Sequence, residues 1–268
     1  MKNFKILLGL LLLSGFVVTA QEDKETSSSE EELAKQLANP VASLISVPFQ
    51  NNFDFGVGPS DGFRYNLNVQ PVIPVSINEN WNMISRTIIP IISQKDVPFK
   101  GNNVTGLGDI AQSVFFSPKE VKNGTVWGLG PVILLPTATD DFLGANKWGL
   151  GPNALLLKLK GQWTYGALVN HIWSIGGSGR NDINATFVQP FATYATKTGA
   201  SYTLASENTQ SWDNDIFGGF LGAYYAKVTK FGNQMVQLSV GPKVYYGNNP
   251  FNPDWGIRAN IILLFPKK

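Results

Sequence analysis

The single histidine of the chain, His171, is the first residue to consider for catalysis, because histidine is the commonest general base. A histidine and a nucleophilic serine on one strand face need an even spacing, since successive side chains point to opposite faces. Ser174 follows His171 by three positions and therefore points the other way if the strand continues. We interpret His171 as a strand-end aromatic residue beside Trp173, and we predict no catalytic residues and no enzyme activity.

Two further patterns resemble sites for cofactors or metals. Gly106, Gly108 and Ala111 match a loose dinucleotide fingerprint, but residues 113–116 read as a strand, so no helix N-terminus follows to bind a pyrophosphate. Acidic pairs at residues 140–141 and 213–215 could bind calcium, yet no glycine-spaced ligand array accompanies them. With one histidine and no cysteine, the sequence predicts neither a cofactor nor a metal site.

The N-terminus predicts export. Lys2 and Lys5 precede an apolar run over residues 6–18, and small residues end at Ala20, which is the pattern of a cleaved signal peptide over residues 1–20. Removal of this leader leaves as many basic as acidic residues, which argues against nucleic acid as a partner.

Residues 21–39 differ from the rest of the chain because they are polar and acidic. Ser29 and Glu32 fit a capping box, so a short helix is predicted over residues 30–38, ahead of Pro40. We interpret this segment as a solvated periplasmic extension, with a plug of the barrel described below as the alternative.

Residues 40–268 predict one all-β domain of about twelve strands, and no apolar stretch approaches the ~20 residues that a membrane helix needs. The expected strands span residues 41–55, 63–77, 81–92, 106–117, 125–136, 148–158, 162–173, 185–196, 200–206, 216–230, 234–246 and 254–265. Connections after even-numbered strands are mostly short and those after odd-numbered strands longer, which is typical of an outer-membrane barrel. The predicted fold is therefore an antiparallel transmembrane β-barrel with a short N-terminal helix.

Aromatic residues at strand ends favour a membrane barrel over a soluble sheet. In the strand over 254–265, Trp255 and Phe265 lie at the two ends of the apolar face, and Trp163 and Trp173 do the same over 162–173. Such residues favour the membrane interface, where the ring is apolar and the indole N–H meets water. The expected girdle comprises Trp81, Trp127, Trp148, Trp163, Trp173, Trp255 and Phe265.

Prolines inside the expected strands point to interruptions. Proline lacks a backbone donor and belongs at bulges, edges or strand ends, and a closed barrel has no edge. Several strands must therefore be bulged or shorter than the spans given above. The prolines concerned are Pro71, Pro74, Pro90, Pro131, Pro152, Pro190 and Pro242.

Polar residues opposite the apolar strand faces are expected to line the lumen. These predicted pore-lining residues are Gln50, Asn52, Asp54, Arg64, Asn66, Asn68, Gln70, Arg86, Asp109, Asn170, Arg258 and Asn260. Amides with a few charges of both signs predict a wet pore of weak charge selectivity.

A series of short motifs in fixed order carries a family resemblance from about residue 33 to the C-terminus. The motifs lie at residues 39–52, 70–74, 106–109, 127–131, 136–139, 148–152, 170–174, 189–191 and 264–267. Together they resemble an outer-membrane transporter family associated with the MetA pathway of phenol degradation. The chain departs from that family at residues 213–222 and in its ending Pro266-Lys267-Lys268, which leaves Phe265 as the expected assembly signal.

The resemblance implies a channel in the outer membrane of a Gram-negative bacterium, for passive passage of small, including aromatic or hydrophobic, solutes. Its expected partners are outer-membrane lipid, the solutes, and the barrel-assembly machinery through the C-terminal strand. Two alternatives remain open: a structural or adhesive barrel without transport, and a soluble secreted β-sandwich that binds a ligand.

Overall fold

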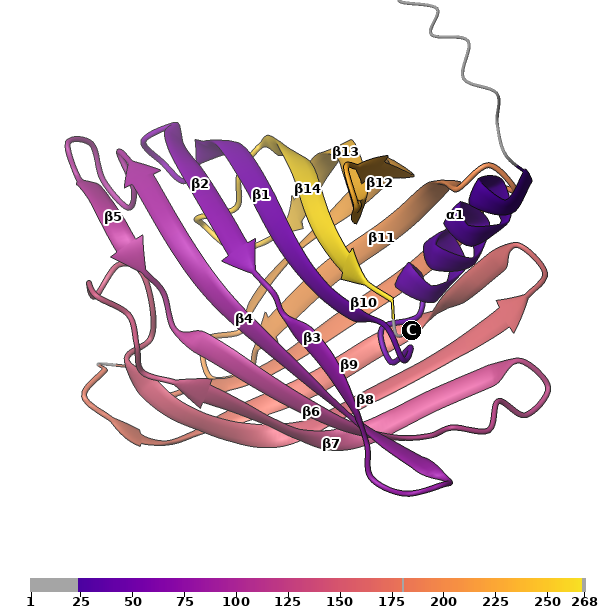
Figure 1. The fold of residues 1–268 in the computed structure, drawn as a ribbon. Coiled ribbons are helices and arrows are strands. Elements are labelled where there is room, and N and C mark those ends of the chain that lie inside the picture. Colours follow the sequence, from indigo (N-terminus) through magenta and orange to yellow (C-terminus); the bar gives the residue numbers. More distant parts are fainter. Residues whose placement is uncertain (1–23, 180, 267–268) are drawn as a thin grey trace, which may run out of the picture.

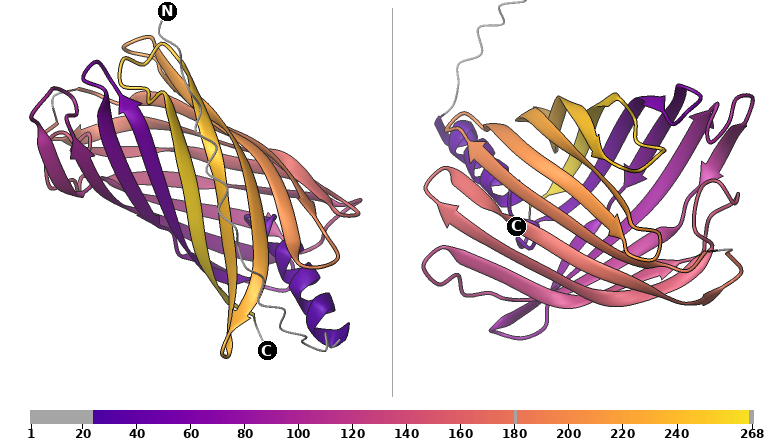
Figure 2. Two further views of the ribbon diagram at one scale, coloured as in Figure 1. Left: turned by 90° about the horizontal axis from the view of Figure 1, so that it is seen from above. Right: turned by 180° about the vertical axis from the view of Figure 1, so that it is seen from behind.

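The computed structural model describes residues 24–179 and 181–266, so the predicted signal peptide lies outside the described residues. All strands belong to one antiparallel sheet that closes on itself (Figures 1 and 2). Closure occurs between β1 (Ile45–Val57) and β14 (Trp255–Phe265), which pair from Ile45↔Phe265 to Phe55↔Trp255. A single closed sheet excludes the β-sandwich and confirms the predicted twelve-stranded barrel with a helix near its N-terminus.

Fourteen strand segments make up the wall. Between β1 and β14 these are β2 (Gly62–Val69), β3 (Val72–Ser76), β4 (Trp81–Lys95), β5 (Asn103–Leu107), β6 (Ile110–Pro118), β7 (Thr125–Leu135), β8 (Lys147–Lys160), β9 (Trp163–Gly177), β10 (Asn184–Ala195), β11 (Ala200–Ser211), β12 (Ile216–Phe231) and β13 (Gln234–Gly247). β2 and β3 pair with one edge of β4, and β5 and β6 with its other edge. Each of these couples is therefore one interrupted strand, which gives the twelve positions.

The prolines lie at the expected interruptions. The break between β2 and β3 falls at Pro71. Pro131 faces Pro152 across the β7–β8 ladder, while the β6–β7 ladder beside Pro131 lapses between Val132 and Leu129. The β8–β9, β10–β11 and β12–β13 ladders lapse in the same way beside Pro152, Pro190 and Pro242. Each of these four prolines stays paired with one neighbouring strand and interrupts the pairing with the other, because proline has no N–H to donate.

The two ends of the barrel differ in their connections. We call the end that bears the start of β1 and the end of β14 the turn end, and the opposite end the loop end. Turn-end connections run from two residues (161–162, 232–233) to six (119–124), whereas the longest loop-end connection is 136–146. The expected sorting is incomplete, because the loop-end connections at 58–61 and 212–215 have only four residues each. The second is short because β11 extends to Ser211, beyond the predicted end at residue 206.

The helix α1 (Lys24–Leu37) is longer than predicted and is not a freely solvated extension. Its Leu33 and Ala34 are buried against Leu44, Val228 and Leu264. Leu264 alternates with the exposed Phe265, so α1 packs on the inner side of the barrel wall at the turn end, beside the ends of β10–β12 (Figure 1). No helix among the described residues is long and apolar enough to cross a membrane.

The outer and inner faces alternate as the period of a strand requires. Along β8, Trp148, Leu150 and Leu156 are exposed on the outside, whereas Asn153 and Leu155 are buried inside. The packed core therefore lies inside the barrel, and the large exposed apolar side chains form its outer surface.

Candidate luminal site

The structure gathers most of the predicted pore-lining residues on the inner face of β1, β2 and β14. Three residues of β1 lie in register with three of β2, in the pairs Gln50↔Asn68, Asn52↔Asn66 and Asp54↔Arg64. On the other side, Gln50 lies opposite Asn260 and Asn52 opposite Arg258. Parity in each strand predicted the shared face, and ring closure makes the first and last strands neighbours.

A buried ion pair forms the first part of this site. Lys243 on β13 donates to Asp54 at 2.7 Å and to Asn52 at 3.2 Å. The Tyr245 hydroxyl also donates to Asp54, at 2.6 Å, so the carboxylate has two strong donors. The Lys243 side chain is only 2% exposed and lies 5.1 Å from the ring centroid of Phe220. A lysine so deeply buried requires this partner, because an isolated buried ammonium is very costly.

A second ion pair adjoins the first. Arg258 binds Glu207 on β11 with two N–H groups, at 2.7 and 3.4 Å. Its Nε also donates to the Asn52 carbonyl oxygen at 2.7 Å, which accepts from Lys243 as well. Asn52 therefore joins the two ion pairs into one hydrogen-bonded network across β1, β11, β13 and β14.

Two more arginines of the lumen have no carboxylate partner among the described residues. Arg64 Nε donates to the side chain of Gln94 at 2.9 Å, and Arg86 donates to that of Gln70 at 2.8 Å. Neither guanidinium forms an ion pair with any described residue. We call Asp54, Arg64, Arg86, Glu207, Lys243 and Arg258 the luminal charge cluster. Its four cations and two carboxylates leave an excess of two positive charges.

The charge cluster lies between two cavities. The turn-side cavity has a volume of about 280 Å³ and is lined by Arg86, Arg258, Tyr224 and the segment that follows α1. The loop-side cavity, of about 290 Å³, is lined by Asp54, Arg64, Glu207, Phe220 and Tyr245. The paired and unpaired charges therefore form a polar layer between two small luminal chambers.

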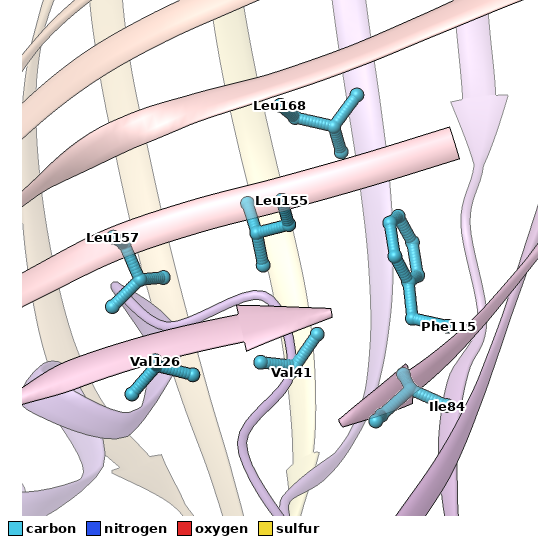
Figure 3. Packing of buried hydrophobic residues seen from close by; sticks show 7 residues of the cluster. All are labelled: Val41, Ile84, Phe115, Val126, Leu155, Leu157 and Leu168. Atoms are coloured by element: carbon cyan, nitrogen blue, oxygen red, sulfur yellow. The ribbon is translucent and has the colours of Figure 1, made fainter. Parts of the chain in front are cut away.

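The side of the lumen formed by β4 and β6–β9 carries a buried apolar cluster (Figure 3). Its buried cluster comprises Val41, Ile84, Phe115, Val126, Leu155, Leu157 and Leu168, from β4, β6, β7, β8, β9 and the segment before β1. Val41 packs on this wall, whereas Leu44, three residues later, packs with α1 on the other side. The segment between α1 and β1 therefore crosses the lumen, from the apolar cluster to the side that bears α1.

Asp109 has a different place from the other predicted pore-lining residues. Its carboxylate accepts from the backbone N–H groups of Ala138, Ala145 and Asn146, at 3.1, 2.6 and 3.1 Å. Gln94, whose side chain also binds Arg64, donates to the Phe142 carbonyl at 3.0 Å. Asp109 therefore holds the 136–146 connection against the inner wall at the loop end.

The last predicted lumen residues form local contacts. Asn170 lies in register with Asn153, whose buried side-chain amide has no hydrogen-bond partner among the described residues. Asn260 donates to Ser239 at 2.8 Å. Both amides face the lumen by strand parity, outside the luminal charge cluster.

His171 and Ser174 do not form a catalytic pair. The His171 ring lies 4.1 Å from the ring of Trp173, on the same outer face, and its Nδ1 bonds Thr186 at 2.8 Å. Ser174 instead bonds Asp182 and the backbone of Ile183. The glycines of the dinucleotide-like pattern lie at the end of β5, which is followed by strand β6 and not by a helix.

The predicted girdle residues lie at the two rims. Trp255 and Phe265 are exposed at opposite ends of β14, and Trp255 stacks on Phe55 at 4.5 Å. Trp127, Trp148, Trp163 and Trp173 are also exposed, whereas Trp81 is half-buried in an edge contact with Trp127.

The sequence interpretation missed both partners in the ion pairs of the lumen. Glu207 lies one residue beyond the expected strand end at residue 206, in a segment that the sequence predicts as a loop. Lys243 lies inside an expected strand, on the face opposite Val240 and Val244, and this parity is the signal in the sequence that points it toward the lumen. Its partner Asp54 is 189 residues away, which no local pattern indicates.

Comparison with known proteins supports the fold and assigns no family. No protein-family model matches the sequence, and no curated protein matches it. The crystal structure of the COG4313 outer membrane channel from Pseudomonas putida F1 superposes with a TM-score of 0.67 at 12% identity, over 83% of this chain and 96% of that chain. NanC porin is also similar, with a TM-score of 0.46 at 12% identity over 82% and 100% of the two chains. The chain therefore shares its fold, a closed twelve-stranded barrel, with the COG4313 outer membrane channel.

Proposed function

We propose that the chain is exported to the outer membrane of a Gram-negative bacterium, where it forms a channel for the passive passage of small solutes. The observation that carries this proposal is the contrast between an apolar outer surface and an interior with two cavities around a charged layer.

In this proposal the turn end faces the periplasm. The predicted leader over residues 1–20 would direct export, and both chain ends would remain on the periplasmic side, as an even number of strands requires. Phe265, exposed at the end of β14, would serve the barrel-assembly machinery as the C-terminal signal, and the girdle residues would contact lipid.

The proposed solutes include aromatic or hydrophobic molecules. The family resemblance of the motifs supports this class, and so does the apolar side of the lumen around Phe115 and Leu168. The polar residues that line the two cavities would bind a polar group of the same solute.

The N-terminal segment limits the proposed conductance. α1 and residues 38–44 line the turn-side cavity, so a wide aqueous path at the turn end requires their displacement. The same packing supports the alternative, a structural or adhesive barrel whose lumen stays closed.

Single-channel recording separates these two functions. Protein folded in detergent, with folding verified by heat-modifiable gel migration, would be incorporated into planar bilayers. We expect small, reproducible current steps from the full chain and larger steps from a variant without residues 24–37. Silence from both folded forms would contradict the channel and favour the structural barrel.

A further inference from the structure

Both carboxylates of the luminal charge cluster already have a cationic partner and a second hydrogen-bond donor. Asp54 accepts from Lys243 and Tyr245, and Glu207 accepts from Arg258 and Gln189. Their charges are therefore compensated within the wall. The excess of positive charge resides on Arg64 and Arg86.

Each of these two arginines retains free hydrogen-bonding capacity. A guanidinium has five N–H donors in a planar fork that matches a carboxylate. Arg64 bonds one acceptor, Gln94, and Arg86 bonds one acceptor, Gln70, among the described residues. The remaining donors are available to an anion.

The two arginines also lie in different cavities. Arg64 lines the loop-side cavity and Arg86 the turn-side cavity, with the Glu207–Arg258 pair between them. Each chamber therefore contains one arginine that forms no ion pair with a described residue, in surroundings where charge interactions are stronger than in bulk water.

The walls of both cavities would accommodate an apolar body beside the anionic group. Phe187, Phe220 and Phe251 line the loop-side cavity, and Leu168 and Phe191 line the turn-side cavity. Both volumes are slightly below the ~300 Å³ at which drug-sized ligand pockets begin, so the occupant must be small.

We propose that the lumen binds small organic monocarboxylates with an aromatic or aliphatic body, at one station on Arg64 and a second on Arg86. The use of these stations in sequence during passage rests on the proposed channel function; the binding itself does not. The expectation of weak charge selectivity is thereby replaced by a preference for anions.

Isosteric probes test the proposal on the full-length folded barrel. Calorimetric titration with benzoate, benzamide and benzylammonium compares an anion, a neutral molecule and a cation of similar shape. We expect benzoate to bind at least about tenfold more tightly than the other two, because hydrogen bonds to a charged group are the stronger ones.

Variants locate the stations. Arg64→Gln and Arg86→Gln should each remove one benzoate site or weaken it about tenfold. Arg86→Lys keeps the charge but loses the planar fork, so the affinity at its site should lie between those of the parent and of Arg86→Gln. Both glutamine variants remove an unpaired cation from a positive cluster, so no carboxylate loses its partner and folding should persist. Lys230→Gln, at an exposed lysine near the turn end, is the matched control and should bind as the parent does.

The outcomes distinguish this inference from the channel proposal. Equal binding of benzoate and benzamide, or full benzoate affinity in the folded Arg64→Gln/Arg86→Gln double variant, would overturn the anion stations. Selective benzoate binding by a barrel that passes no current would support the stations and contradict the channel. Current without selective binding would retain the channel and reject the stations.

Discussion

Truncation of Leu33 to alanine should release α1 from the barrel. Leu33 is 5% exposed and lies on the helix face that packs against Leu44, Val228 and Leu264. Alanine is at least as good a helix former as leucine, so the substitution tests docking and not helix formation.

The burial of Leu33 sets how much docking free energy the substitution should remove. Replacement of a buried leucine by alanine costs ~2 to 5 kcal/mol, and the lower value suits a helix that lies in a water-accessible mouth. A loss of ~2 kcal/mol changes the ratio of docked to undocked helix about 30-fold. The ion pair between Glu30 and Lys227, at 3.3 Å with Lys227 well exposed, adds little to this balance.

Limited trypsin digestion measures the undocked population. Cleavage after Lys35, which bonds Glu31 at 2.7 Å, requires the local chain to leave its site, so its rate follows that population when reclosing is fast. We expect cleavage about 30-fold faster in the Leu33→Ala variant. Glu32→Ala, at an exposed position of the same helix, should leave the rate unchanged. Equal rates for Leu33→Ala and the parent would refute the inference that this contact holds the helix in the mouth.

Three further predictions follow from the polar contacts. Asp109→Asn should raise amide hydrogen exchange in the connection between β7 and β8 at least about tenfold, since the carboxylate holds three of its N–H groups; unchanged exchange would reject this anchoring. Lys243→Gln should lower the free energy of unfolding by ~3 kcal/mol by leaving Asp54 buried without its cation, and urea titration should show recovery when Asp54→Asn is added. Hydrogen bonds from Lys35 and then Gln162 lower the pKa of Glu31 below its ordinary 4.5. The bond from Gln162, in the turn before β9, ties α1 to the barrel, so this contribution to docking is complete above pH 4.5 and is lost as the pH falls through the lowered pKa. A nitroxide label on α1 should therefore become more mobile in acid, and Glu31→Gln should remove that acid step.

The strand pattern could be predicted because its causes are local. A side-chain period of two sets which residues share a face, and the interfacial preference of tryptophan marks the strand ends. For this reason the expected span over 125–136 and the observed Thr125–Leu135 nearly coincide. The interruptions could be predicted as well, because proline has no backbone N–H to donate. The ladders lapse beside Pro131, Pro152, Pro190 and Pro242.

The sequence by itself determined an all-β chain with alternating faces, strand-end aromatics and interrupted strands, because each of these depends on neighbours along one strand. Only the tertiary structure decided that α1 packs inside the mouth and that Glu207 and Lys243 complete the ion pairs. It alone also showed that Arg64 and Arg86 have no carboxylate partner within the described part of the chain. The physical reason is closure of the sheet, which brings β1 beside β14 and places residues from distant strands across one narrow lumen. Burial and charge compensation there are properties of the ring as a whole, and no single strand carries them.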